Sequence, residues 1–148
     1  MREGRKIMSK SVTIVVVAGF VLGMCISYAA AYTIEEKQVD PQKIYWGLPS
    51  SFEKPAEVRY QEIIVETPEY KELKDQKIER GTGRYWILIS QASDRAVRTI
   101  AQVGQESEYD LIAAEGYLGG LEPAIPADDV TELVIKTMQE NLKKAGNR

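Results

Sequence analysis

The sequence predicts a small, mainly helical α+β domain that has a short helical hairpin and a few short strands and is preceded by a signal peptide. Three observations support this fold class. An uncharged apolar run lies near the N-terminus, helical spacing of apolar residues dominates the second half, and short β-branched or aromatic runs stand between glycines and prolines. We expect a signal peptide at 1–31, an irregular proline-containing arm at 32–57 and a single domain at 58–148.

The N-terminal segment has the order of a secretory signal. Four basic residues precede the apolar stretch TIVVVAGFVLGMCI, and Ala29 and Ala31 satisfy the A-x-A requirement of signal peptidase. Cleavage after Ala31 is expected, which predicts a periplasmic or secreted protein. One alternative is an anchor formed by the uncharged residues 12–32, which are long enough to span a bilayer. The other is lipidation at Cys25, although Met24 stands where a small residue is usual.

Composition excludes several classes of function. The chain has 19 basic and 22 acidic residues. Four of the basic residues and one acidic residue lie in the first 31 positions. The mature chain therefore has 15 basic and 21 acidic residues, a net charge of −6. An acidic, exported domain is a poor candidate for binding nucleic acid. Because the sequence has no histidine and only one cysteine, we expect no cofactor, no metal site and no enzymatic activity.

The predicted arm contains three prolines and one compact apolar cluster, Ile44 to Pro49. Proline removes a backbone donor and fixes φ, so an extended or irregular lead is expected. Tyr45, Trp46 and Leu48 either fold back to cover the core or form an exposed aromatic patch that binds a partner.

Residues 58–65, VRYQEIIV, fit either a strand or the first turns of a helix. Thr67, Pro68 and Glu69 are typical of an N-cap followed by the first helical turn, and the helix is expected to continue to Ile78. The glycines of Gly81-Thr82-Gly83 interrupt it.

The run that begins at Arg84 is predicted to be one helix, residues 84–104. Its apolar residues recur at spacings of three and four and form one stripe, namely Tyr85, Leu88, Ala92, Ala96, Ile100 and Val103. The alternative is a strand at 85–89 followed by a helix that starts at Ser93.

The C-terminal third predicts a strand at 108–114, a glycine-rich turn around Tyr117 and a final helix. The GYLGG turn lacks the spacing of a phosphate-binding loop. Asp128 or Asp129 is expected to cap the final helix, which ends near Gly146.

Charged residues give weak signals for a site. Paired carboxylates occur at Glu35-Glu36, Glu106/Glu108 and Asp128-Asp129, but adjacency in sequence does not hold two carboxyl groups across a substrate. Asp94, Arg95 and Arg98 could clamp an anionic ligand or form a solvated helix face.

Two segments of the chain resemble the Skp or OmpH-like periplasmic chaperone family. They are VRYQEIIVETPEYKELK at 58–74, and AQVGQESEYDLIAAEGY at 101–117 followed by PADDVTELVIKTM at 126–138. The resemblance implies a trimeric envelope protein that holds unfolded outer-membrane proteins. The chain departs from the family in two ways. The mature chain is acidic, whereas the family is basic, and its middle region, 68–105, is at most a short hairpin, whereas the family has long arms.

Two hypotheses follow. The first is a non-enzymatic envelope protein that binds other proteins, including unfolded ones, with a possible homo-oligomer and with membrane contact only through an uncleaved signal. Its candidate protein-contact residues are Tyr45, Trp46, Tyr85, Trp86 and Leu88. The second is a small periplasmic ligand-binding or structural envelope domain, which a pocket lined by convergent polar groups would favour.

Overall fold

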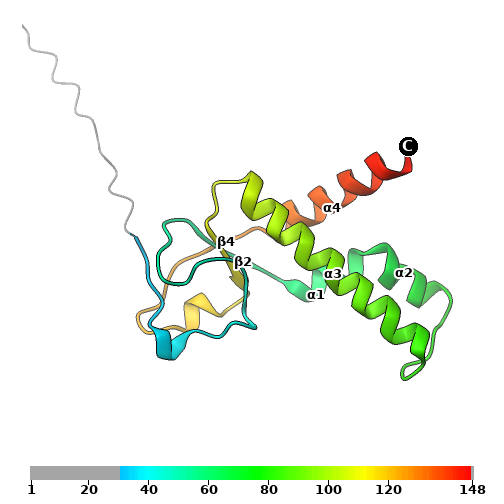
Figure 1. Ribbon diagram of the computed structural model, residues 1–148, viewed down its shortest axis with the longest axis horizontal. Coiled ribbons are helices and arrows are strands. Elements are labelled where there is room, and N and C mark those ends of the chain that lie inside the picture. The colour runs from blue at the N-terminus through cyan, green and yellow to red at the C-terminus, as the bar shows by residue number, and fades with distance from the viewer. Residues whose placement is uncertain (1–30, 148) are drawn as a thin grey trace, which may run out of the picture.

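The computed structural model describes residues 31–147, so the predicted signal peptide lies outside the described residues except for Ala31. Within this range the chain forms an α+β fold of four α-helices and a four-stranded sheet, which confirms the predicted fold class. The sheet lies toward one end of the molecule, and the connection between α2 (Pro68–Asp75) and α3 (Gly83–Glu106) lies at the other (Figure 1).

The sheet is small and mixed. Its strands are β1 (Ile44–Gly47), β2 (Pro55–Val58), β3 (Leu111–Ala114) and β4 (Asp128–Asp129), in the spatial order β1-β3-β2-β4. β3 pairs antiparallel with β1 and parallel with β2, and β2 pairs parallel with β4. Because parallel strands need a long crossover connection, three helices separate β2 from β3 in the sequence.

The segment 32–57 differs from the irregular arm that its prolines suggested. It contains a short 3-10 helix, η1 (Glu36–Gln38), all of β1 and the first three residues of β2. Ile34 and Phe52 from this segment are buried. Pro55 stands at the start of β2, where the missing backbone donor is tolerated. Here the prolines mark the limits of strands, and the segment belongs to the folded body.

The ambiguous run 58–65 holds the last residue of β2 and then most of a helix. β2 ends at Val58, and α1 (Tyr60–Glu66) begins two residues later. Thr67 caps α2 as predicted, because its hydroxyl accepts a hydrogen bond from the Tyr70 amide at 3.2 Å. α2 ends at Asp75, three residues earlier than expected.

One continuous helix, α3, runs from Gly83 to Glu106, so the predicted helix is confirmed and the alternative strand at 85–89 is wrong. Thr82 rather than Ser93 caps it, with the Thr82 hydroxyl accepting from the Tyr85 amide at 3.2 Å. The stripe of apolar side chains explains why one helix forms instead of a strand and a shorter helix. Only an unbroken helix turns the whole stripe toward the sheet and α1.

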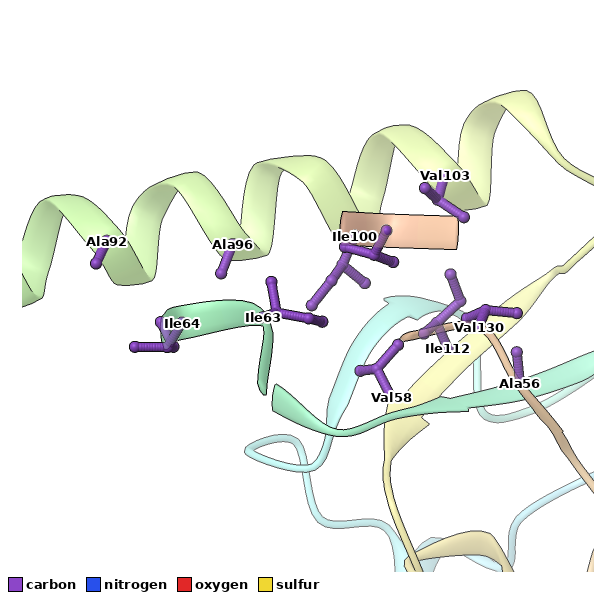
Figure 2. Close-up of a cluster of buried hydrophobic side chains, with 11 residues drawn as sticks. Ala56, Val58, Ile63, Ile64, Ala92, Ala96, Ile100, Val103, Ile112 and Val130 are labelled. Atoms are coloured by element: carbon purple, nitrogen blue, oxygen red, sulfur yellow. The ribbon is translucent and has the colours of Figure 1, made fainter. Parts of the chain in front are cut away.

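Two apolar clusters lie on the two faces of β3. The first joins α1, α3 and the start of α4 to the sheet, and Figure 2 shows the small and branched side chains of α3 pointing toward Ile63, Val58 and Ile112. The second is covered by the N-terminal segment and the loop after β3. Ile112 belongs to the first cluster and its neighbours Leu111 and Ala113 to the second, as the alternation of a strand requires.

The C-terminal elements are close to those predicted. β3 starts at Leu111, three residues after the expected start, and α4 (Thr131–Gly146) follows β4. The expected cap is wrong in position, because the N-cap of α4 is Val130, whose side chain has no group that can accept a hydrogen bond. Asp129, one residue earlier, accepts from the Thr131 amide at 2.9 Å and so satisfies one free amide of the first turn. α4 packs on α1 and α3 near its start, and its far end extends away from the body (Figure 1).

Candidate functional site

Two of the predicted contact residues, Tyr45 and Trp46, lie on β1 and pack against the core. The Tyr45 ring stacks on Tyr60 with centroids 5.3 Å apart, and burial raises the pKa of the Tyr45 phenol. The Trp46 indole lies directly on Gly104 of α3. The core-covering alternative is therefore confirmed for both aromatic residues, whereas Leu48, at 70% exposed, does not cover the core.

The other three predicted contact residues lie near the start of α3 and have different surroundings. Leu88 is buried, so it is not available to a partner. Trp86 is 60% exposed, and its ring meets the edge of the half-buried Tyr85 ring, with centroids 5.2 Å apart. Ile87, which the sequence did not single out, is 59% exposed beside Trp86. We call Lys74, Lys77, Arg80, Tyr85, Trp86 and Ile87 the hairpin-end surface.

Local backbone chemistry fixes the shape of the connection between α2 and α3. The Ile78 amide donates to the Leu73 carbonyl at 3.1 Å and the Lys77 amide donates to the Lys74 carbonyl at 3.2 Å. This pair of bonds is a Schellman ending, in which the residue at Lys77 adopts a left-handed conformation, here with φ of 49°. A lysine at this position is unusual because glycine or asparagine adopts it at lower cost.

A cavity of about 430 Å³ opens beside this ending. The residues that line it are basic, aromatic or aliphatic, namely Tyr70, Leu73, Lys74, Lys77, Ile78, Arg80 and Tyr85. The Lys74 ammonium lies 5.6 Å from the centre of the Tyr70 ring, and the Arg80 Nε donates to the Tyr85 hydroxyl at 3.2 Å. Within residues 31–147 the three cations form no ion pair with a carboxylate.

A second cavity, of about 400 Å³, lies between α2, α3 and the middle of α4 and is polar. Arg95 on α3 reaches Glu69 on α2, with its Nε 2.9 Å from each carboxylate oxygen. Burial is the largest influence on the pKa of Glu69 and acts to raise it, but the hydrogen bonds from Arg95, a backbone hydrogen bond and the charge of Arg95 together outweigh burial, so the pKa lies below its ordinary value. Arg98 lines the same cavity, whereas Asp94 does not, so the structure divides the charged set that the sequence grouped together.

The adjacent carboxylates of Asp128 and Asp129 have structural partners. Asp129 accepts from the Thr131 amide and from the Arg59 guanidinium, each at 2.9 Å, and Asp128 accepts from the Tyr109 hydroxyl at 3.2 Å. Across the described residues, no group of three or more acidic, histidine or cysteine side chains is arranged to hold a metal ion. Nor is any helix in this range both long enough and apolar enough to cross a membrane.

One carboxylate that sequence reasoning missed organises the glycine-rich turn. Glu57 on β2 accepts hydrogen bonds from the amides of Gly116 and Leu118, at 2.9 and 2.8 Å, and so holds the turn before η2 (Leu118–Gly120) against the sheet. The two partners are 59 and 61 residues away in sequence, so no local pattern could indicate the contact.

Comparison of the chain with protein-family models, with curated proteins and with solved structures gives no match in any of the three. The resemblance to the Skp or OmpH-like family therefore rests on the quoted sequence segments, and the function has to be argued from the surfaces described above.

Proposed function

We propose that this chain is an exported, non-enzymatic envelope protein, periplasmic or secreted, that binds other proteins through the hairpin-end surface. No cofactor is needed for this role. The N-terminal sequence supports export, and the partner class includes unfolded envelope proteins, as the sequence resemblance implies.

The observation that carries the proposal is the exposure of two consecutive apolar residues, Trp86 and Ile87, near the start of α3. Leu88, Ile100 and Val103 of the same helix are buried, and Val97, at 40%, is less exposed than either residue. Covering a tryptophan or an isoleucine contributes about 2 kcal/mol through the apolar area removed from water. Tryptophan, tyrosine and arginine are also the residues most enriched where binding energy is concentrated in protein interfaces.

The positive charge of the hairpin-end surface favours partners with acidic contact segments. The mature chain is acidic overall, yet Lys74, Lys77 and Arg80 meet at one cavity whose lining has no carboxylate. Opposite charges across an interface increase the rate of encounter and disfavour wrong partners. We expect partners whose contact segment combines apolar side chains with aspartate or glutamate.

Aggregation of a diluted, unfolded outer-membrane barrel protein, followed by light scattering, tests the proposal. The exported form of the chain should suppress aggregation when present in excess. The double variant Trp86→Ser/Ile87→Ser should lose most of this effect. Leu48→Ser is the matched control, because it removes an exposed apolar side chain on the sheet side of the molecule, and it should behave as the wild type.

The same sample gives the oligomeric state by static light scattering, and self-association is expected. A monomer that does not change aggregation even in excess would contradict the proposed function. Equal loss of suppression in the Leu48 variant would show that exposed apolar surface acts without a specific site.

N-terminal sequencing of the exported chain tests its processing. Cleavage after Ala31 leaves Tyr32 as the first residue, and the body of the protein already holds this residue. The Tyr32 amide donates to the Phe52 carbonyl at 2.6 Å, the Phe52 amide donates back at 3.0 Å, and the two rings stack. A sequence that starts at Met1 would instead support the anchored alternative.

A further inference from the structure

The polar cavity between α2, α3 and α4 plays no part in the proposed protein contact. It is lined by Glu69, Gln91, Arg95, Arg98, Thr99, Gln102, Met138 and Asn141. Its volume of about 400 Å³ is within the range of small-molecule sites. Side chains from three helices meet in it, and they have complementary roles.

The α3 wall supplies the positive charge. Glu69, which is only 14% exposed, holds Arg95 through the Nε and one terminal nitrogen, which fixes the plane of the guanidinium. Arg98 follows one turn later, and its Nε makes a single long bond of 3.3 Å to the Asp94 carbonyl. Among residues 31–147 neither terminal nitrogen of Arg98 has a hydrogen-bond partner. The two guanidinium groups of α3 and the Glu69 carboxylate of α2 give the cavity lining a net charge of +1.

The α4 wall supplies neutral polar groups and an apolar floor. The Asn141 amide donates to the Gln102 side-chain oxygen at 2.8 Å, which orients both side chains at the cavity. The Asn141 oxygen can still accept a hydrogen bond, and Gln91 of α3 adds a further side-chain amide to the lining. Met138, which is buried, provides a polarisable apolar surface beneath them.

We propose that this cavity binds a small monocarboxylate that also carries an amide and an apolar group, of the size of an acylated amino acid. The carboxylate would bind the terminal nitrogens of Arg98 and Arg95, in the planar geometry that guanidinium groups favour. Multiply charged anions are disfavoured, because Glu69 lies in the same lining and the net charge to be balanced is a single unit. This inference goes beyond the proposed protein contact and does not depend on it.

The test compares N-acetyl-L-leucine with its neutral amide, N-acetyl-L-leucinamide, by NMR titration of the full exported chain. The side-chain amide signals of Gln91, Gln102 and Asn141 report binding. We expect these signals to shift with the carboxylate, and the neutral amide to bind at least about tenfold more weakly. Inorganic phosphate at the same concentration should shift them less.

Arg98→Gln should raise the dissociation constant of N-acetyl-L-leucine about tenfold, the scale of one charge-assisted hydrogen bond. Arg98 is exposed, so the variant should fold, and a wild-type circular dichroism spectrum checks this. Arg84→Gln is the matched control on the same helix, and its affinity should be unchanged. Equal binding of the carboxylate and its amide, tighter binding of phosphate, no shift up to about 10 mM, or an unchanged dissociation constant in Arg98→Gln would each overturn the proposal.

Discussion

The two tryptophans of the chain lie in opposite surroundings, one on β1 of the sheet and the other near the start of α3. Trp46 on β1 is pressed against the bare backbone of Gly104, whereas Trp86 on α3 is 60% exposed. The second apolar cluster lies wholly at the sheet end, and the first extends from the sheet along α1 and α3. At the hairpin end, helix caps and surface ion pairs such as Arg84–Glu72 hold the chain in place. The difference indicates that close packing at the sheet end fixes the fold, which leaves the hairpin end able to expose apolar surface.

The largest effect on the free energy of unfolding is expected at Gly47, where the sheet end has no space for a side chain. Gly47 has φ of +91°, and a Cβ there would overlap the carbonyl oxygen of Asp110 on the neighbouring chain segment. Backbone strain and overpacking together should make Gly47→Ala lower the free energy of unfolding by about 4 kcal/mol. Gly116 also has positive φ but no atom within 4 Å, so Gly116→Ala should cost about 1 kcal/mol. Urea unfolding of both variants checks this, and equal costs would contradict the packing argument.

The next effect compares two isoleucines of the same helix. Ile100 is fully buried beneath the sheet-side face of α3, and Ile87 is exposed at the hairpin end. Ile100→Ala should lower the free energy of unfolding by about 3 kcal/mol, because the cavity it leaves cannot fully collapse. Ile87→Ala should change it by less than about 0.5 kcal/mol. Thermal or urea unfolding measures both, and a large loss at Ile87 would mean that the hairpin end is part of the core.

Thr67 and Thr82 offer a closer comparison, because both hydroxyls make the same two hydrogen bonds. Each accepts from the amide three residues later and donates to a carbonyl three residues earlier. Thr67 is completely buried and Thr82 is exposed. Thr67→Ala should cost about 2 kcal/mol and Thr82→Ala about 0.7 kcal/mol, because water replaces the lost bonds only at the exposed site. Chemical unfolding gives both values, and the reverse order would be inconsistent with this reasoning.

The smallest effect depends on pH. Because the pKa of Glu69 is lower in the folded chain, its contribution is fully present above the unfolded value near 4.5 and is lost as the pH falls through the folded value. The free energy of unfolding of the wild type should therefore exceed that of Glu69→Gln by about 1 kcal/mol at pH 7. This difference should shrink toward zero near pH 3. Urea unfolding at both pH values measures it.

Glu72→Gln is the control for this pH dependence. Glu72 lies on the same helix in an exposed ion pair with Arg84, and the variant should differ little from wild type at either pH. A difference between wild type and Glu69→Gln that is the same at pH 7 and pH 3 would contradict the stabilising role of the Arg95 contact.

Elements with a local cause could be predicted from the sequence. The Thr67 cap and the single long helix each follow from spacing or from a side chain that bonds a nearby amide. At α4 the aspartate was expected to be the cap, but it lies one residue before the N-cap, Val130. The same reasoning misplaced the segment 32–57, because its strands exist only through pairing with β3 and β4, which are distant in sequence.

The candidate site could be predicted only in part, for the same physical reason. The sequence indicated Tyr85 and Trp86, and the apolar stripe of α3 already contained the signal that separates the buried Leu88, which lies on it, from the exposed Ile87, which does not. Which residues of α2 this helix meets is set by tertiary packing. The pairing of Arg95 with Glu69 joins residues 26 positions apart, and the cationic cavity forms from a left-handed lysine that no sequence rule favours.

The most direct test uses the two tryptophan indole N–H signals, which report the two ends of the molecule in a single NMR spectrum. An unfolded outer-membrane protein is titrated into the exported chain at a concentration where it remains soluble. We predict that the Trp86 signal shifts or broadens while the Trp46 signal stays unchanged. Perturbation of Trp46 alone, equal perturbation of both, or no change in either signal would contradict protein binding at the hairpin end.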